Sequence, residues 1–276
     1  MLPTTSSPSM CPLSQFKAED SRHISVVLTD IDDTLTTAGI MPAIAYEALE
    51  RLQNAGIITV AVTGRPAGWC DMIARFWPID AVVGENGAFY FKYNRTEQRM
   101  IRCYHADETE RAINRERLDT IRSAVLREVP DCRISADQPY READLAVDFA
   151  EDVPRLTDSH INQIVALFEA HGATAKVSSI HVNGWFGNYD KLVMTKNLLR
   201  DIFALDPDAP ETRNKMLFVG DSPNDEPMFQ FFTHSVGVAN LLHFAERMTH
   251  KPAWITNGIG GEGFAELVEA LLRAKD

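Results

Sequence analysis

The sequence has few cysteines and none of the spacings that hold zinc or form a disulfide framework. Its four cysteines contain no C-x-x-C pair and lie far apart, at Cys11, Cys70, Cys103 and Cys132. This usage is typical of reduced thiols and not of a stapled secreted domain. The eight histidines also lack the spacing of metal ligands. We therefore expect a cytoplasmic protein that uses neither thiolate nor imidazole to bind metal.

A long apolar run and an N-terminal leader are also missing. No segment approaches the roughly 18 apolar residues of a membrane span. The opening MLPTTSSPSMCPLSQ is rich in Pro, Ser and Thr and has neither a basic n-region nor an apolar h-region. The sequence therefore predicts a disordered tail over residues 1–22 and no membrane partner.

Positive charge is scarce, with 27 Lys and Arg against 39 Asp and Glu, for a net charge of −12. A negative protein is repelled by nucleic acids and by anionic membranes, so neither is expected as the main partner. A local anion site remains compatible with an acidic total. The length of 276 residues, with 45% hydrophobic content, is enough for one large domain or two modest ones.

Short apolar runs alternate with helical patterns at both ends of the chain. ISVVLTD, IITVAVTG and DAVVGENG are separated by helical patterns over 43–55 and 66–76, and the rhythm returns from KMLFVGD to a closing helix over 263–274. This alternation indicates βαβ units and a parallel sheet buried on both faces. We predict an α/β core with a doubly wound (Rossmann-like) sheet, formed by residues 23–89 and 186–276.

The pattern changes between residues 90 and 185. GAFYFKY and RMIRCYH have the pattern of paired antiparallel strands, and a long charged helix is expected over 108–128. A strand at DLAVDF, a helix over 157–171 and a strand at TAKVSS follow. Residues 90–185 are therefore predicted to be an inserted α+β domain.

Polar residues follow four of the core runs, where each predicted strand ends. They are Asp30 with Asp32, Thr63-Gly64-Arg65, Glu85-Asn86-Gly87, and Gly220-Asp221 with Asn224 and Asp225. Each group alone has a simpler interpretation as a turn or a helix cap, with Ser222 as the cap in GDSPND. In open α/β sheets, however, ligands bind beyond the carboxyl ends of the strands. Acids and a hydroxyl at one edge therefore favour a functional site.

Three carboxylates, Asp30, Asp32 and Asp33, stand almost side by side at the end of one buried run. Like charges there repel one another, and burial removes their hydration. A divalent cation shared with carboxylates from another strand makes the cluster favourable. Oxygen ligands without His or Cys indicate Mg²⁺, which usually binds one or two carboxylates, waters and a substrate phosphate.

Two other features are ambiguous. GIGGEG, residues 258–263, fits the dinucleotide pattern G-x-G-x-x-G, but the chain ends before the strand and acidic residue that this pattern requires. A glycine-rich turn into the last helix is the favoured interpretation. Lys191 stands where a helix begins, and an ordinary solvated lysine is the simpler interpretation from its position alone.

Taken together, these residues resemble the haloacid dehalogenase superfamily of phosphatases, in particular the Cof-like subgroup IIB, which has a large α+β cap inserted after the third strand. The resemblance extends from about Ile24 to Leu272. It is based on DIDDT at 30–34, TGR at 63–65, ENGA at 85–88, Lys191, and GDSPND at 220–225. Each motif is weak alone, but the set in this order and spacing is specific.

The resemblance implies roles for four catalytic residues. Asp30 would be the nucleophile that forms an aspartyl phosphate, and Asp32 would be the acid/base. Thr63 and Lys191 would hold phosphate oxygens. The implied substrate contacts are Thr63, Gly64, Arg65, Asn86 and Lys191. The implied metal ligands are Asp30, the backbone carbonyl of Asp32, and Asp221, with Asn224 and Asp225 acting directly or through water.

The sequence departs from the family pattern at two positions. The family commonly has Gly where this chain has Asp33, and Gly after the lysine where this chain has Leu192. Asp is tolerated in turn conformations, so the first departure is mild. The second leaves Lys196 as a fallback for Lys191.

The expected function is Mg²⁺-dependent hydrolysis of a small phosphorylated metabolite, with a sugar phosphate as the expected class and the 90–185 cap reading the leaving group. Alternatives within enzymes are a mannosyl- or glucosyl-3-phosphoglycerate phosphatase and a phosphomutase. A phospho-receiver signalling module also uses an Asp acceptor, Mg²⁺, Thr and Lys. It would be a single domain of roughly 120 residues, near the usual domain size, without an acid two residues after the acceptor, so Asp32 and the insertion argue against it.

Overall fold

The computed structural model describes residues 10–275 and divides into two compact units. Unit 1 holds the described residues of Met1–Val62, Trp77–Ala81 and Lys196–Asp276. Unit 2 holds Thr63–Phe76 and Val82–Thr195. The whole of the predicted insertion, 90–185, falls within unit 2, together with the segments around 63–76 and 186–195 that the sequence analysis assigns to the core.

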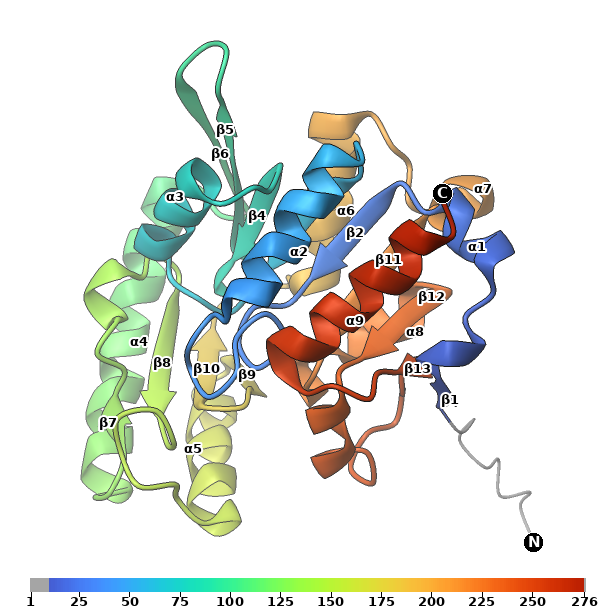
Figure 1. The fold of residues 1–276 in the computed structure, drawn as a ribbon. Coiled ribbons are helices and arrows are strands. Elements are labelled where there is room, and N and C mark those ends of the chain that lie inside the picture. Colours follow the sequence, from blue (N-terminus) through green and yellow to red (C-terminus); the bar gives the residue numbers. More distant parts are fainter. Residues whose placement is uncertain (1–9, 276) are drawn as a thin grey trace, which may run out of the picture. The chain divides into compact units, whose positions relative to one another are not determined.

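Unit 1 is built on a parallel sheet formed by the apolar runs from both ends of the sequence (Figure 1). The strand order is β1-β13-β12-β11-β2-β3, and each neighbouring pair is parallel. The strands are β1 (Cys11–Pro12), β2 (Val26–Thr29), β3 (Ile58–Val62), β11 (Met216–Gly220), β12 (His234–Gly237) and β13 (Trp254–Ile255). Every residue of β2 and β11 is buried, as expected for strands covered on both faces. The predicted α/β fold class is thus confirmed.

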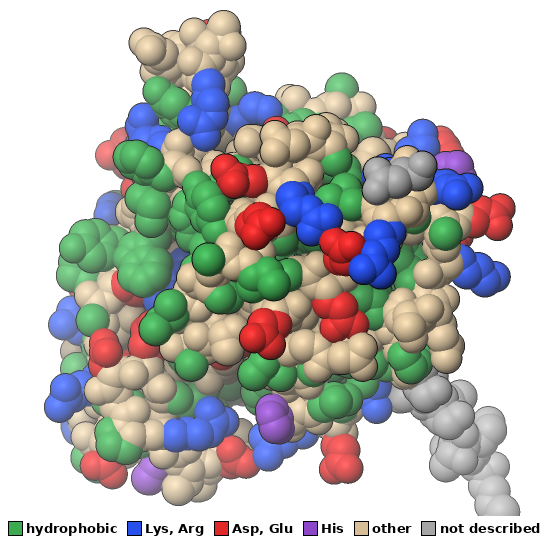
Figure 2. Space-filling view, in the orientation of Figure 1, with side chains coloured by type: hydrophobic (Ala, Val, Ile, Leu, Met, Phe, Trp, Pro, Cys, Tyr) green, Lys and Arg blue, Asp and Glu red, His purple; other side chains and the backbone are tan. Residues whose placement is uncertain are grey.

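Helices cover both faces of this sheet (Figure 1). α2 (Ala43–Asn54) and α9 (Gly260–Arg273) lie on one face, and α8 (Glu226–Phe231) lies on the other. α2 buries Ala45, Ala48, Leu49 and Leu52, the apolar stripe that helical periodicity predicts. On the outer surface, side chains of both charges mix over α2 and α9 (Figure 2), and Arg51 pairs with Glu269 at 2.8 Å.

The remaining helical segments of unit 1 connect these elements. They are η1 (Leu13–Gln15), α1 (Ala18–His23), α7 (Pro210–Arg213), η4 (Pro223–Asp225) and η5 (Ala239–His243). α6 (Lys191–Phe203) begins in unit 2 and continues into unit 1. The short 3-10 helix η5 follows β12, and the closing helix begins at Gly260, three residues earlier than the predicted start at residue 263.

The predicted disordered tail needs a correction. Residues 1–9 lie outside the described residues, but from Cys11 onward the chain forms β1, η1 and α1. Leu13 is buried and the Phe16 ring packs against Trp254 at 4.6 Å between centroids. Two apolar side chains and pairing with β13 therefore order a segment whose Pro and Ser content suggests disorder.

Unit 2 contains antiparallel strands, as the insertion pattern predicts. β4 (Ala81–Gly84) pairs with β5 (Phe89–Asn94), which pairs with β6 (Arg99–Tyr104). A separate antiparallel sheet has the order β7-β8-β10-β9, formed by β7 (Arg133–Ile134), β8 (Asp144–Asp148), β10 (His181–Trp185) and β9 (Thr174–Val177). The helices of unit 2 are α3 (Ala67–Phe76), η2 (Glu85–Gly87), α4 (Glu108–Glu128), η3 (Gln138–Tyr140) and α5 (Asp158–Ala170).

α4 and α5 pack on the four-stranded sheet through one apolar cluster, which includes Ile121, Val125, Val147, Ile164 and Phe168. Their starts follow from capping. Asp107 accepts the N–H of Glu110 at 2.8 Å, and the Thr157 side chain accepts the N–H of His160.

The central strand β10 is absent from the sequence predictions because its pattern is atypical. It is fully buried although HVNGW contains His181, Asn183 and Gly184. A Cβ on Gly184 would lie 2.1 Å from the Phe168 ring, so the glycine is needed for this helix to pack on the sheet. No helix in the described part of the chain is both long and apolar enough to cross a membrane.

Candidate active site

Three acidic residues of unit 1 come together where β2 and β11 end. Asp30 follows β2, Asp221 follows β11, and Asp225 closes η4. One carboxylate oxygen from each lies within 4.8 Å of the others, and all three side chains are buried. A backbone hydrogen bond brings the two strand ends together, because Asp30 N–H donates to Val219 O of β11 at 2.9 Å. The structure therefore brings together three of the five predicted metal ligands.

The chemistry of this group fits Mg²⁺. Buried carboxylates at this spacing repel one another and lose hydration, and a divalent cation offsets both effects. All three donors are hard oxygen atoms, which Mg²⁺ prefers.

The GDSPND loop is shaped around Asp225. Its Oδ2 accepts the N–H groups of Asp221 at 3.2 Å and Ser222 at 3.4 Å. A Cβ on Gly220 would lie 2.4 Å from that same oxygen, so only glycine leaves room for the turn. Asn224 is partly buried, and its Oδ1 accepts the Ser222 hydroxyl at 2.7 Å. That bond fixes the orientation of the Asn224 amide oxygen.

The turn after Asp30 explains the first departure from the family pattern. Asp33 has a φ of 55°, in the left-handed region that favours glycine and that Asp tolerates better than most residues. Its N–H donates to Thr36 Oγ1 at 2.9 Å, which closes the turn. Asp32 is partly buried and is not among the three clustered carboxylates.

Unit 2 gathers a second set of predicted site residues. Thr63 N–H donates to Val83 O at 2.9 Å, and Thr63 O accepts the N–H of Asn86 at 3.1 Å. A Cβ on Gly64 would lie 3.2 Å from both polar atoms of the Asn86 amide. Asn86 has a φ of 56°, and its buried Nδ2 has no hydrogen-bond partner among residues 10–275. The TGR and ENGA motifs therefore lie against each other.

Lys191 is held beside this group by Gly87. A Cβ on Gly87 would lie 2.0 Å from Asp190 O and 3.0 Å from Lys191 N, and the φ of Gly87 is 109°. Lys191 is only 2% exposed, which contradicts the interpretation as a solvated lysine on a first helical turn. The fallback, Lys196, donates to Asp208 at 2.7 Å and lies 4.0 Å from the Phe231 ring centroid.

Comparison with protein-family models gives one match for this sequence, described as haloacid dehalogenase-like hydrolase, over residues 27–115. Those residues belong to the haloacid dehalogenase-like hydrolases. The superfamily resemblance drawn from the motifs is confirmed. A search of curated proteins finds no significant match.

Solved structures of haloacid dehalogenase-like proteins share the fold over nearly the whole chain. One, from Bacteroides thetaiotaomicron, aligns with a TM-score of 0.61 at 17% identity, over 89% of this chain and 98% of its own. The sucrose-phosphatase of Synechocystis sp. PCC6803, solved with sucrose and phosphate, has a TM-score of 0.61 at 16% identity, over 91% and 98%. A subclass IIB sugar phosphatase has a TM-score of 0.59 at 13% identity, over 89% and 98%. At such identities the likeness establishes the fold.

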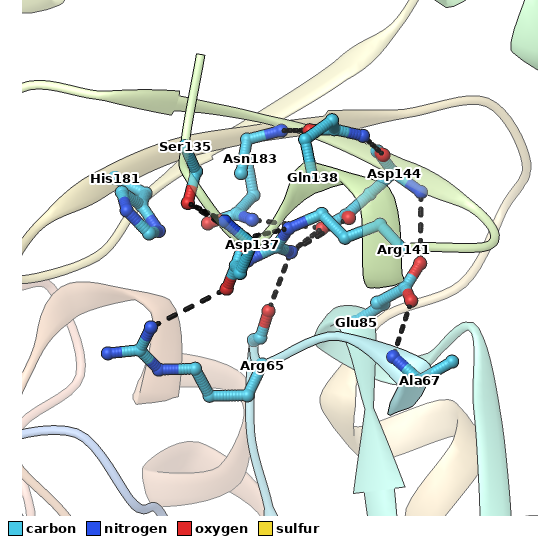
Figure 3. Close-up of polar contacts among 12 residues, drawn as sticks. Arg65, Ala67, Glu85, Ser135, Asp137, Gln138, Arg141, Asp144, His181 and Asn183 are labelled. Atoms are coloured by element: carbon cyan, nitrogen blue, oxygen red, sulfur yellow. Dashed lines mark hydrogen bonds and ion pairs between the residues drawn. The ribbon is translucent and has the colours of Figure 1, made fainter. Parts of the chain in front are cut away.

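A buried charge network lies next to the TGR and ENGA motifs (Figure 3). The Glu85 carboxylate accepts four backbone N–H groups, from Ala67, Glu142, Ala143 and Asp144, at 2.6 to 3.2 Å. Burial and Asp144 raise the pKa of Glu85 to about 8, opposed by Arg141 and by the N–H groups of Glu142 and Ala143. The bonding pattern nevertheless favours the carboxylate, because donors occupy both oxygens and leave no acceptor for a proton on Glu85.

Arg141 is the cation of this network. It pairs with Asp137 at 2.8 Å and with Asp144 at 2.9 Å, and it donates to Gly64 O at 2.9 Å. The TGR turn is therefore tied to the loop before β8. The sequence analysis does not identify Arg141, Asp137 or Asp144, because their partners lie up to 77 positions away.

Arg65, a predicted substrate contact, is engaged within unit 2. It lies 2.8 Å from Glu151 and 3.5 Å from Asp137, and its guanidinium stands 4.5 Å from the Trp69 ring centroid. Burial alone would raise the pKa of Glu151, but contacts with His181 and Arg65 outweigh it and lower this pKa to about 2. The Arg65 guanidinium is thus already engaged by two carboxylates. If Arg65 contacts the substrate, it does so while it is paired with these carboxylates.

Proposed function

We propose that this protein is a Mg²⁺-dependent phosphomonoester hydrolase that acts on a small phosphorylated metabolite. One observation carries the proposal: Asp30, Asp221 and Asp225 offer carboxylate oxygens within 4.8 Å of one another. Asp30 lies in the segment that matches the haloacid dehalogenase-like hydrolase family, and the other two follow β11, the strand that pairs with β2. The chemistry of such a set suits phosphoryl transfer, which needs positioning and charge neutralisation more than covalent help from many groups.

In the first step Asp30 attacks phosphorus through one carboxylate oxygen. A bond forms between this oxygen and phosphorus, and the bond from phosphorus to the ester oxygen breaks. Asp32 donates its proton to the leaving alkoxide, so the alcohol leaves neutral. Thr63 and Lys191 hold phosphate oxygens through this step, with Gly64, Arg65 and Asn86 as further substrate contacts.

In the second step Asp32, now a carboxylate, takes a proton from water. The water oxygen attacks the aspartyl phosphate, which frees Asp30 and releases inorganic phosphate. Mg²⁺ held by Asp30, the Asp32 carbonyl and Asp221, with support from Asn224 and Asp225, would neutralise charge on the phosphate oxygens.

The substrate class proposed is a sugar phosphate. Two proteins with this fold are a sucrose-phosphatase and a sugar phosphatase, and residues 90–185 would be the cap that reads the leaving group. A phosphomutase or a glycosyl-3-phosphoglycerate phosphatase would use the same first step. A cytoplasmic location remains a prediction based on the cysteine content.

The test is phosphate release from a panel of phosphorylated metabolites, with added Mg²⁺ or with EDTA. Asp30→Asn should abolish turnover while leaving the thermal midpoint nearly unchanged, because the amide cannot act as the nucleophile. Asp131→Asn, the same change at an exposed position, is the matched control and should turn over normally. Undiminished activity of Asp30→Asn, or full activity in EDTA, would refute the proposal.

A further inference from the structure

Asn240 is a polar residue of unit 1 that none of the motifs above includes. It lies in η5, just after β12, and both ends of its side-chain amide are engaged. Nδ2 donates to Asp221 Oδ2 at 3.2 Å and to the backbone carbonyl of Asp33 at 2.9 Å. Oδ1 accepts the N–H of Gly260 at 2.9 Å. Because two donors and an acceptor are used on three segments, the amide has one orientation.

The contact with Asp221 is the shorter of two side-chain contacts described for that carboxylate. Thr34 Oγ1 approaches Asp221 Oδ1 at 3.4 Å, close to the limit for a hydrogen bond. The Asn240 bond at 3.2 Å lies on the other oxygen. The Asn240 bond therefore restrains the rotation of the carboxylate plane more than the long Thr34 contact does, and the Asp221 side chain is 1% exposed. Partners of this kind orient metal ligands in proteins.

The third contact of Asn240 connects it to the glycine-rich segment that resembles a dinucleotide motif. Gly260 has a φ of 47°, and a Cβ there would lie 2.4 Å from Thr36 O. A Cβ on Gly261 would lie 2.7 Å from Leu35 O. The start of α9 therefore packs at backbone distance against the turn that follows Asp30, which gives the glycines a packing role.

We propose that Asn240 is a positioning residue for the metal ligand Asp221. Its amide holds the Asp221 carboxylate and the Asp33 carbonyl in one arrangement, and Gly260 at the start of α9 holds the amide. The inference rests on the proposed function, because it assumes that Asp221 binds a divalent cation.

The direct test is a titration with Mn²⁺ in the absence of substrate. The electron paramagnetic resonance signal of free Mn²⁺ reports how much of the ion is bound. Asn240→Ala should weaken binding about 10- to 100-fold, the usual effect of losing a residue that orients a metal ligand. In activity assays the Mg²⁺ concentration for half-maximal rate should rise by a similar factor, with the KM for substrate at saturating Mg²⁺ nearly unchanged.

Asn257→Ala is the matched control. Its Nδ2 donates to Glu266 at 2.9 Å, so this change also removes an amide contact near the start of α9 but leaves Asp221 untouched. The thermal midpoint without metal should fall by similar amounts in both variants, and only Asn240→Ala should lose Mn²⁺ affinity. Asn240→Ser, too short to bridge the three segments, should show the same loss if the alanine variant does not fold.

Equal Mn²⁺ affinity in the wild type and in the folded Asn240 variant would overturn the inference while leaving the proposed function intact. A loss of equal size in Asn257→Ala would also overturn it, because the effect would then come from α9. If the wild type bound no Mn²⁺ and released no phosphate, the proposed function itself would fail.

Discussion

Lys191 and Asp33 show how much a single residue's environment adds to its identity. Sequence position alone favours a solvated lysine at residue 191, yet the side chain is 2% exposed at the first turn of α6. Asp33 replaces a common glycine, and its φ of 55° shows that the backbone conformation typical of glycine is retained. For single residues, the sequence motifs thus predict which positions form the site. The burial of Lys191 and the φ of Asp33 add information that the motifs do not contain.

At the same scale, Asp32→Ala should separate the two proton transfers. With an alkyl phosphate, whose leaving group needs a proton, the rate should fall about 10²- to 10⁴-fold. With p-nitrophenyl phosphate the first step needs no acid, so aspartyl phosphate should accumulate and give a burst of nitrophenol in rapid-mixing experiments. Normal turnover of the alkyl phosphate would exclude Asp32 as the acid/base.

Two glycines of unit 2 leave room for close contacts between its segments. Gly87 ends η2 and touches the start of α6, and Gly64 leaves room for the Asn86 amide. The buried Glu85 then ties the end of β4 to the segment leading into β8 through three N–H groups, and to the start of α3 through the N–H of Ala67. These contacts join segments that a helix or strand pattern treats as independent.

Gly87→Ala should therefore displace the start of α6. The new Cβ would meet Asp190 O at 2.0 Å, so Lys191 must move, and we expect a raised KM and a lowered kcat together with a loss of stability. Gly172→Ala is the matched control, because its φ is 75° but no described atom beyond its two chain neighbours lies within 4 Å of the added Cβ. It should lose only about 1–3 kcal/mol of stability from backbone strain and keep normal kinetics. Equal kinetics in the two variants would show that Gly87 does not position Lys191.

For the whole molecule, the predicted site residues are divided between the two units. The candidate metal ligands all lie in unit 1, and the TGR, ENGA and Lys191 residues lie in unit 2. The stability of unit 2 also includes ion pairs, among them the buried pair of Arg141 with Asp144 and the partly exposed pair of Arg65 with Glu151. Buried pairs make folding stability depend on pH.

Glu151 predicts the direction of that dependence. Its pKa is about 2 in the folded protein and near 4.5 ordinarily, so the unfolded chain binds the proton more tightly. Its contribution is present above about pH 4.5 and is lost as the pH falls toward 2, and solvent around the partly exposed carboxylate keeps that contribution small. Denaturant unfolding between pH 6 and 3 should show a shallower decline for Glu151→Gln than for the wild type. Glu169→Gln, at an exposed position on α5, should leave the slope unchanged, and an unchanged slope in Glu151→Gln would contradict the assignment.

The sequence by itself determined the parallel core, the antiparallel insertion and the ends of the strands that carry Asp30 and Asp221. These follow from hydrophobic period and from motif spacing, which are local properties of the chain. Only the tertiary structure decided that Leu13 and Phe16 order the segment after Cys11, that Lys191 is buried, and that Asn240 contacts Asp221. The reason is physical: each depends on a partner that is distant in the sequence, from 19 positions for Asn240 and Asp221 to more than 200 for Phe16 and Trp254, and a hydrogen bond or a ring contact between such partners leaves no periodic trace in the sequence.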